Sequence, residues 1–119
     1  MAGPAWMRAA ERAALTLHAR TRGKPGSEHF VYVILLHNPN RRDAWGLYVG
    51  QTSRDPDLRF DQHKSGYRAS RAARRFGICL LPRLVAHLNR VSRKESLELE
   101  TLLAAAFRAA PVTWVEGGH

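Results

Sequence analysis

The sequence predicts one α/β domain of the α+β type. Its core is expected to be a small three-stranded antiparallel sheet with the first strand central and helices on its flanks. Three observations support this: a dense β-branched and aromatic run at Phe30–Leu36, a second strand pattern at Trp45–Thr52, and helix-start signals at Asp55-Pro56 and Ser92. A chain of 119 residues is long enough for one packed core and too short for two. Apolar residues are 45% and charged residues 24%, a composition that excludes wholesale disorder.

The charge balance is strongly basic. Nineteen Lys and Arg residues oppose ten Asp and Glu residues, which gives a formal net charge of +9. Such an excess favours nucleic acid or another polyanion as the partner, because each neutralised phosphate releases counterions. The alternative is a basic protein without such a partner.

Cysteine content and hydropathy indicate the compartment. Cys79 is the only cysteine, so no intrachain disulfide can form, and we expect a reducing, cytoplasmic setting. No apolar run approaches the length that crosses a bilayer, and the N-terminus lacks the continuous apolar core of a secretory signal. We therefore expect no membrane partner.

The N-terminal part is predicted to be a separate unit of residues 1–27. Apolar residues recur at helical spacing over residues 4–21, which predicts an amphipathic helix. Gly, Pro and charged residues at Thr21–Ser27 predict a flexible linker before the main domain, residues 28–119. The helix could be a packed accessory, a swapped arm or a loosely attached appendage.

The next two segments predict a hairpin. Phe30–Leu36 lacks polar alternation, which is typical of a strand covered on both faces and hence central in its sheet. A turn-rich loop with a basic tip at Arg41 and Arg42 follows. Trp45–Thr52 is then the partner strand, with Gly50 as the structural turn that ends it.

A polar cluster follows this hairpin. Asp55 is a good N-cap and Pro56 suits the first helical position, so a helix begins there. It places Arg59 and His63 four residues apart on one face, next to Tyr48 at the strand end. A tyrosine, an arginine and a histidine together indicate a site that acts on a phosphate group.

A run of cations follows this helix. No acidic residue occurs from Lys64 through Val91, which favours a phosphate contact over a merely solvated helix face. The predicted nucleic-acid-binding residues are Lys64, Arg68, Arg71, Arg74 and Arg75, the arginines on one face of a helix.

The third strand and the last helix complete the prediction. Ile78–Leu88 is apolar, but Pro82 cannot donate to a ladder, so this strand begins after the proline, lies at an edge or carries a bulge. Ser92 and Glu95 form a capping box that opens a helix reaching about Ala110, and Val112–Val115 could add a short final strand.

One carboxylate of that helix is unusual. Glu100 borders the predicted buried stripe, where an acidic side chain is costly unless it is paired or bound to a cation. It is therefore either the ion-pair partner of an arginine or a metal ligand. The predicted stripe consists of Leu99, Leu102, Leu103, Ala106 and Phe107.

The ordered set of motifs resembles the GIY-YIG nuclease domain. Phe30-Val31-Tyr32 matches the first motif without its usual glycine, and Tyr48-Val49-Gly50 matches the second. The arginine and histidine of the next helix and the glutamate of a later one follow as Arg59, His63 and Glu100. The resemblance spans residues 30–107. The asparagine that the family often has near the end of the fold is replaced here by Thr113-Trp114.

The resemblance implies a catalytic set. Glu100 would hold a single divalent cation, Mg²⁺ or Mn²⁺, and Arg59 would contact the scissile phosphate. Tyr48 or His63 would be the general base, and Tyr32 would line the site. Each residue also has a structural alternative: rim tyrosines, a surface histidine, and an arginine paired with Glu100.

Three functions follow from these alternatives. The first is a metal-dependent DNA endonuclease directed by DNA structure or by weak sequence preference, with a homodimer or a larger protein supplying specificity. RNA remains open as a substrate. The second is a basic nucleic-acid-binding module with a degenerate nuclease site, and the third is an adaptor that docks a larger nuclease.

Overall fold

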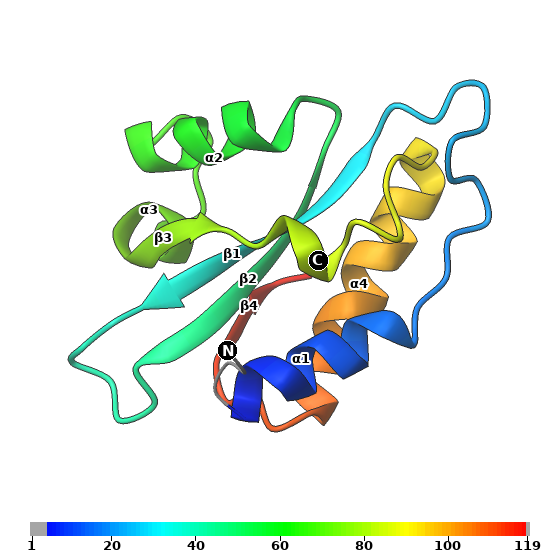
Figure 1. The fold of residues 1–119 in the computed structure, drawn as a ribbon. Helices are drawn as coiled ribbons and strands as arrows, with labels where there is room; N and C mark the ends of the chain where they lie inside the picture. The colour runs from blue at the N-terminus through cyan, green and yellow to red at the C-terminus, as the bar shows by residue number, and fades with distance from the viewer. Residues whose placement is uncertain (1–4, 119) are drawn as a thin grey trace.

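The computed structural model describes residues 5–118, and a mixed four-stranded sheet forms its centre (Figure 1). The strand order is β3-β1-β2-β4, with β1 antiparallel to both β2 and β3, and β4 parallel to β2. The three predicted antiparallel strands are therefore joined by a fourth, and β1 lies inside the sheet as predicted. The strands are β1 Phe30–His37, β2 Trp45–Thr52, β3 Gly77–Leu80 and β4 Val115–Gly117.

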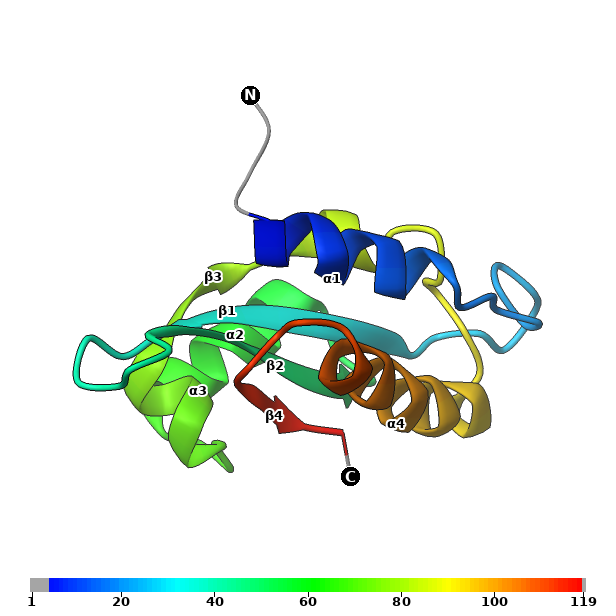
Figure 2. The ribbon, with the colours of Figure 1, turned by 90° about the horizontal axis from the view of Figure 1, so that it is seen from below.

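Helices cover both faces of this sheet. Figure 2 shows α1 and α3 on opposite sides of it. The helices are α1 Ala5–Leu15, α2 Pro56–Ser65, α3 Arg71–Phe76, the short 3₁₀ helix η1 Pro82–Leu84, and α4 Arg93–Ala109. Within residues 5–118, none of them is long and apolar enough to cross a membrane.

Alternation along β1 divides the core into two layers. Val31 and Val33 point to the layer that contains α1, η1 and α4. Tyr32, Ile34 and Leu36 point to the layer under α2 and α3. Both layers are apolar, which is why β1 reads as a continuous hydrophobic run. The tyrosine face, under α2 and α3, carries the candidate site.

The third strand is shorter and earlier than predicted. It occupies Gly77–Leu80 at the sheet edge, and a register shift interrupts its pairing with β1 between Leu35 and Leu36. The edge position and the irregularity are confirmed, but the start after Pro82 is wrong. Pro82 instead begins η1, where its missing N–H is no loss.

The two helices above the tyrosine face have clear ends. The Asp55 carboxylate accepts from the Asp57 N–H at 2.8 Å, so the predicted cap is confirmed, and Gly66 closes α2 in the left-handed conformation at φ 91°. Ser70 caps α3, which spans six residues. Arg68 precedes that helix at φ 45°, so the predicted cations do not share one helix face.

The N-terminal helix packs into the main core. It ends at Leu15 and not near residue 21, and Ala10 and Ala14 are buried in the same layer as β1 and α4. The segment that follows is tied to the start of α4. Gly23 N–H donates to the Arg90 carbonyl at 3.0 Å, within the segment that the sequence predicts to be flexible.

The capping box of α4 forms only in part. Ser92 Oγ accepts from the Glu95 N–H at 3.1 Å, as predicted. The Glu95 side chain does not reach back to Ser92. It is 2% exposed and accepts from the backbone N–H groups of Arg20 and Thr21, each at 2.7 Å, while the Thr21 hydroxyl accepts from the Ser92 N–H. A distant segment therefore takes the place of the second half of the box.

Candidate active site

The two motif tyrosines lie side by side on one face of the sheet. In the β1–β2 register, Tyr32 is opposite Gly50 and Tyr48 is opposite Ile34, so the tyrosines are diagonal neighbours. Their ring centroids are 6.2 Å apart and the planes are tilted by 36°. The sheet thus brings together two phenols from residues sixteen positions apart.

Gly50 lies inside β2 and does not form a turn. It is buried and pairs with Tyr32, and the strand continues to Thr52. A Cβ built on Gly50 would be 2.4 Å from Cζ and Oη of Tyr32. The prediction of a turn is therefore wrong. The glycine is required because the tyrosine ring lies across its Cα, a contact between strands that sequence spacing does not reveal.

His63 of α2 is completely buried against these tyrosines. Its Nδ1 accepts from the Ser70 N–H at 3.1 Å, which places the proton of the neutral ring on Nε2. Nε2–H then donates to the Tyr32 hydroxyl oxygen at 2.7 Å. Burial, together with the positive charge of Arg59, lowers the pKa of His63 to about 4. The ring is therefore neutral at pH 7 with both nitrogens engaged.

Both phenols are held in the protonated form. Burial raises the pKa of Tyr32, and the neighbouring Tyr48 raises it further, while Arg59 opposes the shift. Burial also raises the pKa of Tyr48, and the negative charge of Glu100 adds to it, again against Arg59. Deprotonation of Tyr48 at neutral pH thus requires additional positive charge nearby.

Arg59 lies beside the tyrosines and fixes the loop after α2. Its guanidinium donates to the carbonyl oxygens of Tyr67 at 3.2 Å and Arg68 at 2.7 Å, and to Gln62 Oε1 at 3.2 Å. The side chain is half-buried, and its charge acts on both phenols and on His63. These contacts orient one edge of the guanidinium toward the loop, so Arg59 is held in place next to the phenols.

Glu100 reaches the same cluster from α4. It is 8% exposed, so the prediction that it borders the core is confirmed, and its charge acts on Tyr48. Leu99, Leu103 and Phe107 are buried as predicted. Leu102 is 53% exposed and is not part of the stripe.

The donor set can be compared with the needs of a divalent cation. Within residues 5–118, no three His, Cys, Asp or Glu side chains gather as a metal-binding group. Glu100 offers a hard carboxylate beside a phenol. One carboxylate completed by waters and substrate phosphate oxygens suits Mg²⁺ or Mn²⁺ and does not suit a metal that needs a full protein cage. The residues present therefore fit a single, partly hydrated divalent cation.

The predicted cations divide into two groups. Arg71, Arg74 and Arg75 line a hollow of 530 Å³ together with Gly66 and Ala69. Lys64 joins them, because its Nζ donates to the Arg74 carbonyl at 2.7 Å. Arg68 lies apart and packs over the ring of Tyr67.

Sequence reasoning missed two residues that support the site. Ser70 both caps α3 and fixes the His63 tautomer, and its position before a helical run was a usable cap signal. Asn89 pairs with both backbone groups of Val31 through its side chain, at 2.7 and 2.9 Å. No local sequence pattern predicts the pairing of Asn89 with Val31, because fifty-eight residues separate them.

The cluster therefore unites groups from β1, β2, α2 and α4. Tyr32, Tyr48 and His63 are in ring contact, with the Tyr48 and His63 centroids 5.3 Å apart. Arg59 and Glu100 act electrostatically on the phenols. Comparisons of the chain with protein-family models, curated proteins and solved structures find no match.

Proposed function

We propose that this protein is a metal-dependent endonuclease of the GIY-YIG type that hydrolyses DNA phosphodiester bonds. The observation that carries the proposal is the convergence of five residues from four elements on one cluster. Two phenols and a histidine are in ring contact, Arg59 acts on all three, and the nearly buried Glu100 acts on Tyr48. This combination of groups suits phosphodiester chemistry. RNA is retained as an alternative substrate.

The protein groups have distinct roles in this proposal. Arg59 contacts the scissile phosphate and stabilises the charge that develops on its oxygens, as a fixed guanidinium does well. Tyr48 is half-buried and lies under the charges of Arg59 and Glu100; it orients the attacking water and, once deprotonated to the phenolate, receives its proton. Tyr32 is buried and its hydroxyl oxygen accepts from His63 Nε2–H, so its ring is fixed next to that of Tyr48.

His63 is a positioning residue in this scheme. Its Nδ1 is occupied by the Ser70 N–H and its Nε2–H by the Tyr32 hydroxyl oxygen. A ring with a pKa near 4 and no free lone pair is a poor proton acceptor at neutral pH. Between the two candidate bases, this environment favours Tyr48.

Glu100 would hold a single Mg²⁺ or Mn²⁺. When bound, the ion supplies Lewis acidity for the phosphate, charge stabilisation for the 3′ leaving oxygen and a positive charge that lowers the pKa of Tyr48. The chain contributes the anionic ligand, and burial of Tyr32 and His63 excludes bulk water from the Tyr32 hydroxyl while Tyr48 stays accessible. The hollow of Arg71, Arg74 and Arg75 carries the flanking backbone.

Specificity is proposed to come from DNA structure, from weak sequence preference, or from a second copy or larger partner. A chain of 119 residues offers little surface beyond this cluster for reading a long site. The single cysteine accords with action in a reducing cytoplasmic compartment.

The test compares nicking of supercoiled plasmid, branched DNA, single-stranded DNA and RNA with Mg²⁺, Mn²⁺ or EDTA. Glu100→Gln and Arg59→Ala are each expected to lower the cleavage rate by about 100-fold or more. Glu98→Gln and Arg12→Ala are the matched controls: a partly exposed carboxylate on α4 and an exposed arginine on α1. Circular dichroism verifies that each variant is folded. Wild-type rates in folded Glu100→Gln would overturn the proposal.

A non-catalytic nucleic-acid-binding module is the second candidate. It is favoured by one observation, that both phenols have raised pKa values and His63 is neutral with its nitrogens engaged. Salt-sensitive DNA binding without nicking under any metal condition would select this candidate.

A further inference from the structure

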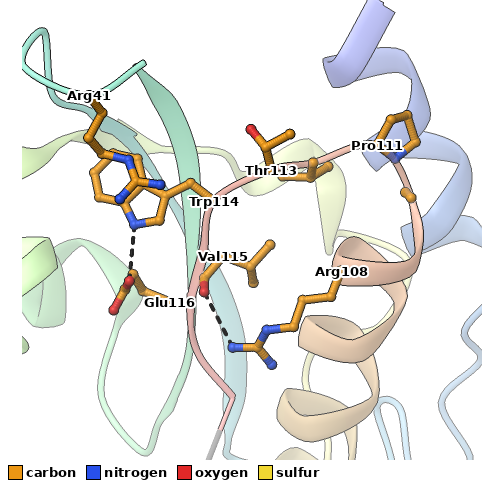
Figure 3. Close-up of a pocket in the computed structure, with 9 residues that line it drawn as sticks. Arg41, Arg108, Pro111, Thr113, Trp114, Val115 and Glu116 are labelled. Atoms are coloured by element: carbon orange, nitrogen blue, oxygen red, sulfur yellow. Dashed lines mark hydrogen bonds between the residues drawn. The ribbon is translucent and has the colours of Figure 1, made fainter. Parts of the chain in front are cut away.

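A second polar hollow, of 570 Å³, lies beside β4 (Figure 3), whose Glu116 pairs with Tyr48 in the sheet. It is formed by segments far apart in the chain: the β1–β2 loop, the end of α4 and residues 110–116. Arg41 and Arg108 contribute the two cations, and Trp114 and Glu116 contribute the indole and the carboxylate. None of these residues belongs to the cluster proposed for catalysis.

Arg41 is held on an aromatic platform. Its guanidinium carbon is 4.3 Å from the centroid of a Trp114 ring, and Figure 3 shows the two groups stacked. Stacking occupies the face of a guanidinium and leaves its in-plane donors available, apart from Nε, which donates to the Asp43 carbonyl at 3.3 Å. The exposed Arg41 is therefore oriented in advance for an oxyanion.

The platform itself is fixed from three sides. Phe76 of α3 meets the Trp114 ring edge-on at a centroid distance of 5.7 Å. The indole Nε1–H donates to Glu116 Oε2 at 3.0 Å. A Cβ on Gly46 would be 2.6 Å from the indole, so that glycine leaves the ring its place. Trp114 is 5% exposed and presents a rigid surface to Arg41.

The charges leave a net positive hollow. Arg108 donates through Nη2 to the carbonyl oxygens of Val115 and Gly117, each at 3.3 Å, so its charge is not neutralised there. Within the described residues, neither Arg41 nor Arg108 forms an ion pair. Two guanidiniums and one carboxylate therefore line the hollow, and that carboxylate accepts the indole N–H.

We propose that this hollow is a second phosphate-binding subsite, which takes a backbone phosphate of the bound nucleic acid several nucleotides from the bond that is cut. The inference rests on the proposed function, because it concerns the path of the same substrate. The lining suits a phosphate diester: it holds a stacked guanidinium, whose Nη donors have no partner among residues 5–118, and a second guanidinium.

Position supports one path for both sites. Arg108 follows Glu100 by eight residues on α4, a separation of about 12 Å along the helix axis. Phosphates of one DNA strand advance about 3.4 Å per step along the duplex, so this distance corresponds to roughly three to four base steps. Phe76 links the Trp114 platform to the neighbouring Arg75, which lines the first basic hollow.

The test measures binding of a duplex of roughly 20 base pairs by fluorescence anisotropy in EDTA, so that no cleavage occurs. The double variant Arg41→Gln/Arg108→Gln is expected to weaken binding roughly tenfold at moderate salt and to reduce the salt slope by roughly two. Arg12→Gln/Arg83→Gln, with the same charge change on exposed residues near α1, is expected to change both much less.

A second readout reports on the hollow directly. The Trp114 indole N–H resonance is expected to shift on addition of DNA in the wild type, and much less in Arg41→Lys, which keeps the charge and loses the planar stack. Inorganic phosphate at the same phosphate concentration is expected to leave it unshifted. A Trp114 resonance that shifts to saturation with inorganic phosphate and does not shift with DNA would identify a free-anion site and overturn the proposal.

The two proposals fail separately. Wild-type affinity and slope in the folded double variant overturn the subsite even if the protein cleaves DNA. Loss of affinity in the double variant supports the subsite even if Glu100→Gln and the wild type both fail to nick DNA, because binding in EDTA does not depend on catalysis.

Discussion

His63 shows how burial converts a titratable residue into a fixed hydrogen-bonding element. The ring is fully enclosed, and both nitrogens are used, one by the Ser70 N–H and one by the Tyr32 hydroxyl. Protonation would require a charge in an apolar surrounding and would break the bond from Ser70. The low pKa of His63 is thus the energetic signature of its structural role.

We therefore expect His63 to make stability depend on pH. The unfolded ring takes up its proton near pH 6.5 and the folded ring only near pH 4, so the unfolded chain binds the proton first as the pH falls. Stability is lost across that window, by an amount on the order of 3 kcal/mol, and this loss levels off below it. Thermal unfolding followed by circular dichroism from pH 7 to 4 measures it.

The comparison variant is His63→Gln, since glutamine can donate to Tyr32 and accept from Ser70 without titrating. Its melting temperature should fall less steeply over the same pH range than that of the wild type. His18→Gln, at an exposed position, should follow the wild type. Parallel curves for wild type and His63→Gln would contradict the assignment.

Gly50 provides a second test at the same contact. A methyl group there would lie 2.4 Å from Tyr32, so Gly50→Ala is expected to cost about 2–3 kcal/mol in unfolding free energy and to displace the phenol. In a Tyr32→Ala background the clash is absent, so the same change should cost much less. Urea denaturation of the four proteins measures the coupling, and additive effects would exclude this contact as the reason for the glycine.

Among the secondary-structure elements, the junction between α1 and α4 depends on one carboxylate. Burial alone would raise the pKa of Glu95, but hydrogen bonds from Arg20 and Thr21 more than offset it, so the pKa lies below its ordinary value. A lowered pKa means that this contribution to stability is present above the unfolded value and is lost as the pH falls through the folded one. The segment after α1 is thereby fixed to the first turn of α4.

Glu95→Gln is expected to release this segment. The Arg20 and Thr21 N–H groups donate to different carboxylate oxygens, so one of these partly buried donors would meet the glutamine NH₂ and be left unpaired, and we expect a loss of about 2–4 kcal/mol. Hydrogen exchange should increase at residues 20–23 and in α1. Glu98→Gln removes only the exposed contact with Arg20 and should leave both measurements unchanged. Unaltered exchange in Glu95→Gln would refute this account of the junction.

For nucleic-acid binding by the whole molecule, we expect the location of the positive charge to matter more than the net charge. Cations line two hollows, one beside α3 and one beside β4, and the edge-to-face contact of the Phe76 and Trp114 rings lies between them. Helix α1 lies on the opposite side of the sheet from α3 (Figure 2). If nucleic acid binds along the hollows, removal of positive charge there will weaken binding more than removal of the same charge elsewhere.

Two triple variants with the same net charge test this. Each replaces three arginines by glutamine and lowers the formal charge from +9 to +6, since 9 − 3 = 6. The first changes Arg71, Arg74 and Arg75; it should reduce the salt slope of DNA binding by roughly two to three. The second variant changes the exposed residues Arg12, Arg83 and Arg93, and it should reduce the salt slope only a little. Equal slopes for both would mean that binding depends on net charge alone.

Local signals in the chain were sufficient for much of the fold. The apolar run of β1, the cap at Asp55 and the cap at Ser92 depend on residues within a few positions of one another, so the printed order of amino acids already implies them. The grouping of Arg59 with His63 is equally local, being one turn of α2. The sequence could also suggest, from its ordered motifs, which tyrosines and which glutamate to consider together.

Contacts between distant segments required the folded chain. Four contacts join parts of the chain that share no local pattern. They are the parallel pairing of β4 with β2, the hydrogen bonds of Glu95 with residues 20 and 21, the packing of Tyr32 on Gly50, and the stacking of Arg41 on Trp114. Their energies depend on burial and on the partner that is met, and neither is a property of a short segment. The neutral state of His63 belongs to this class, because α2, β1 and the Ser70 backbone must meet before its environment exists.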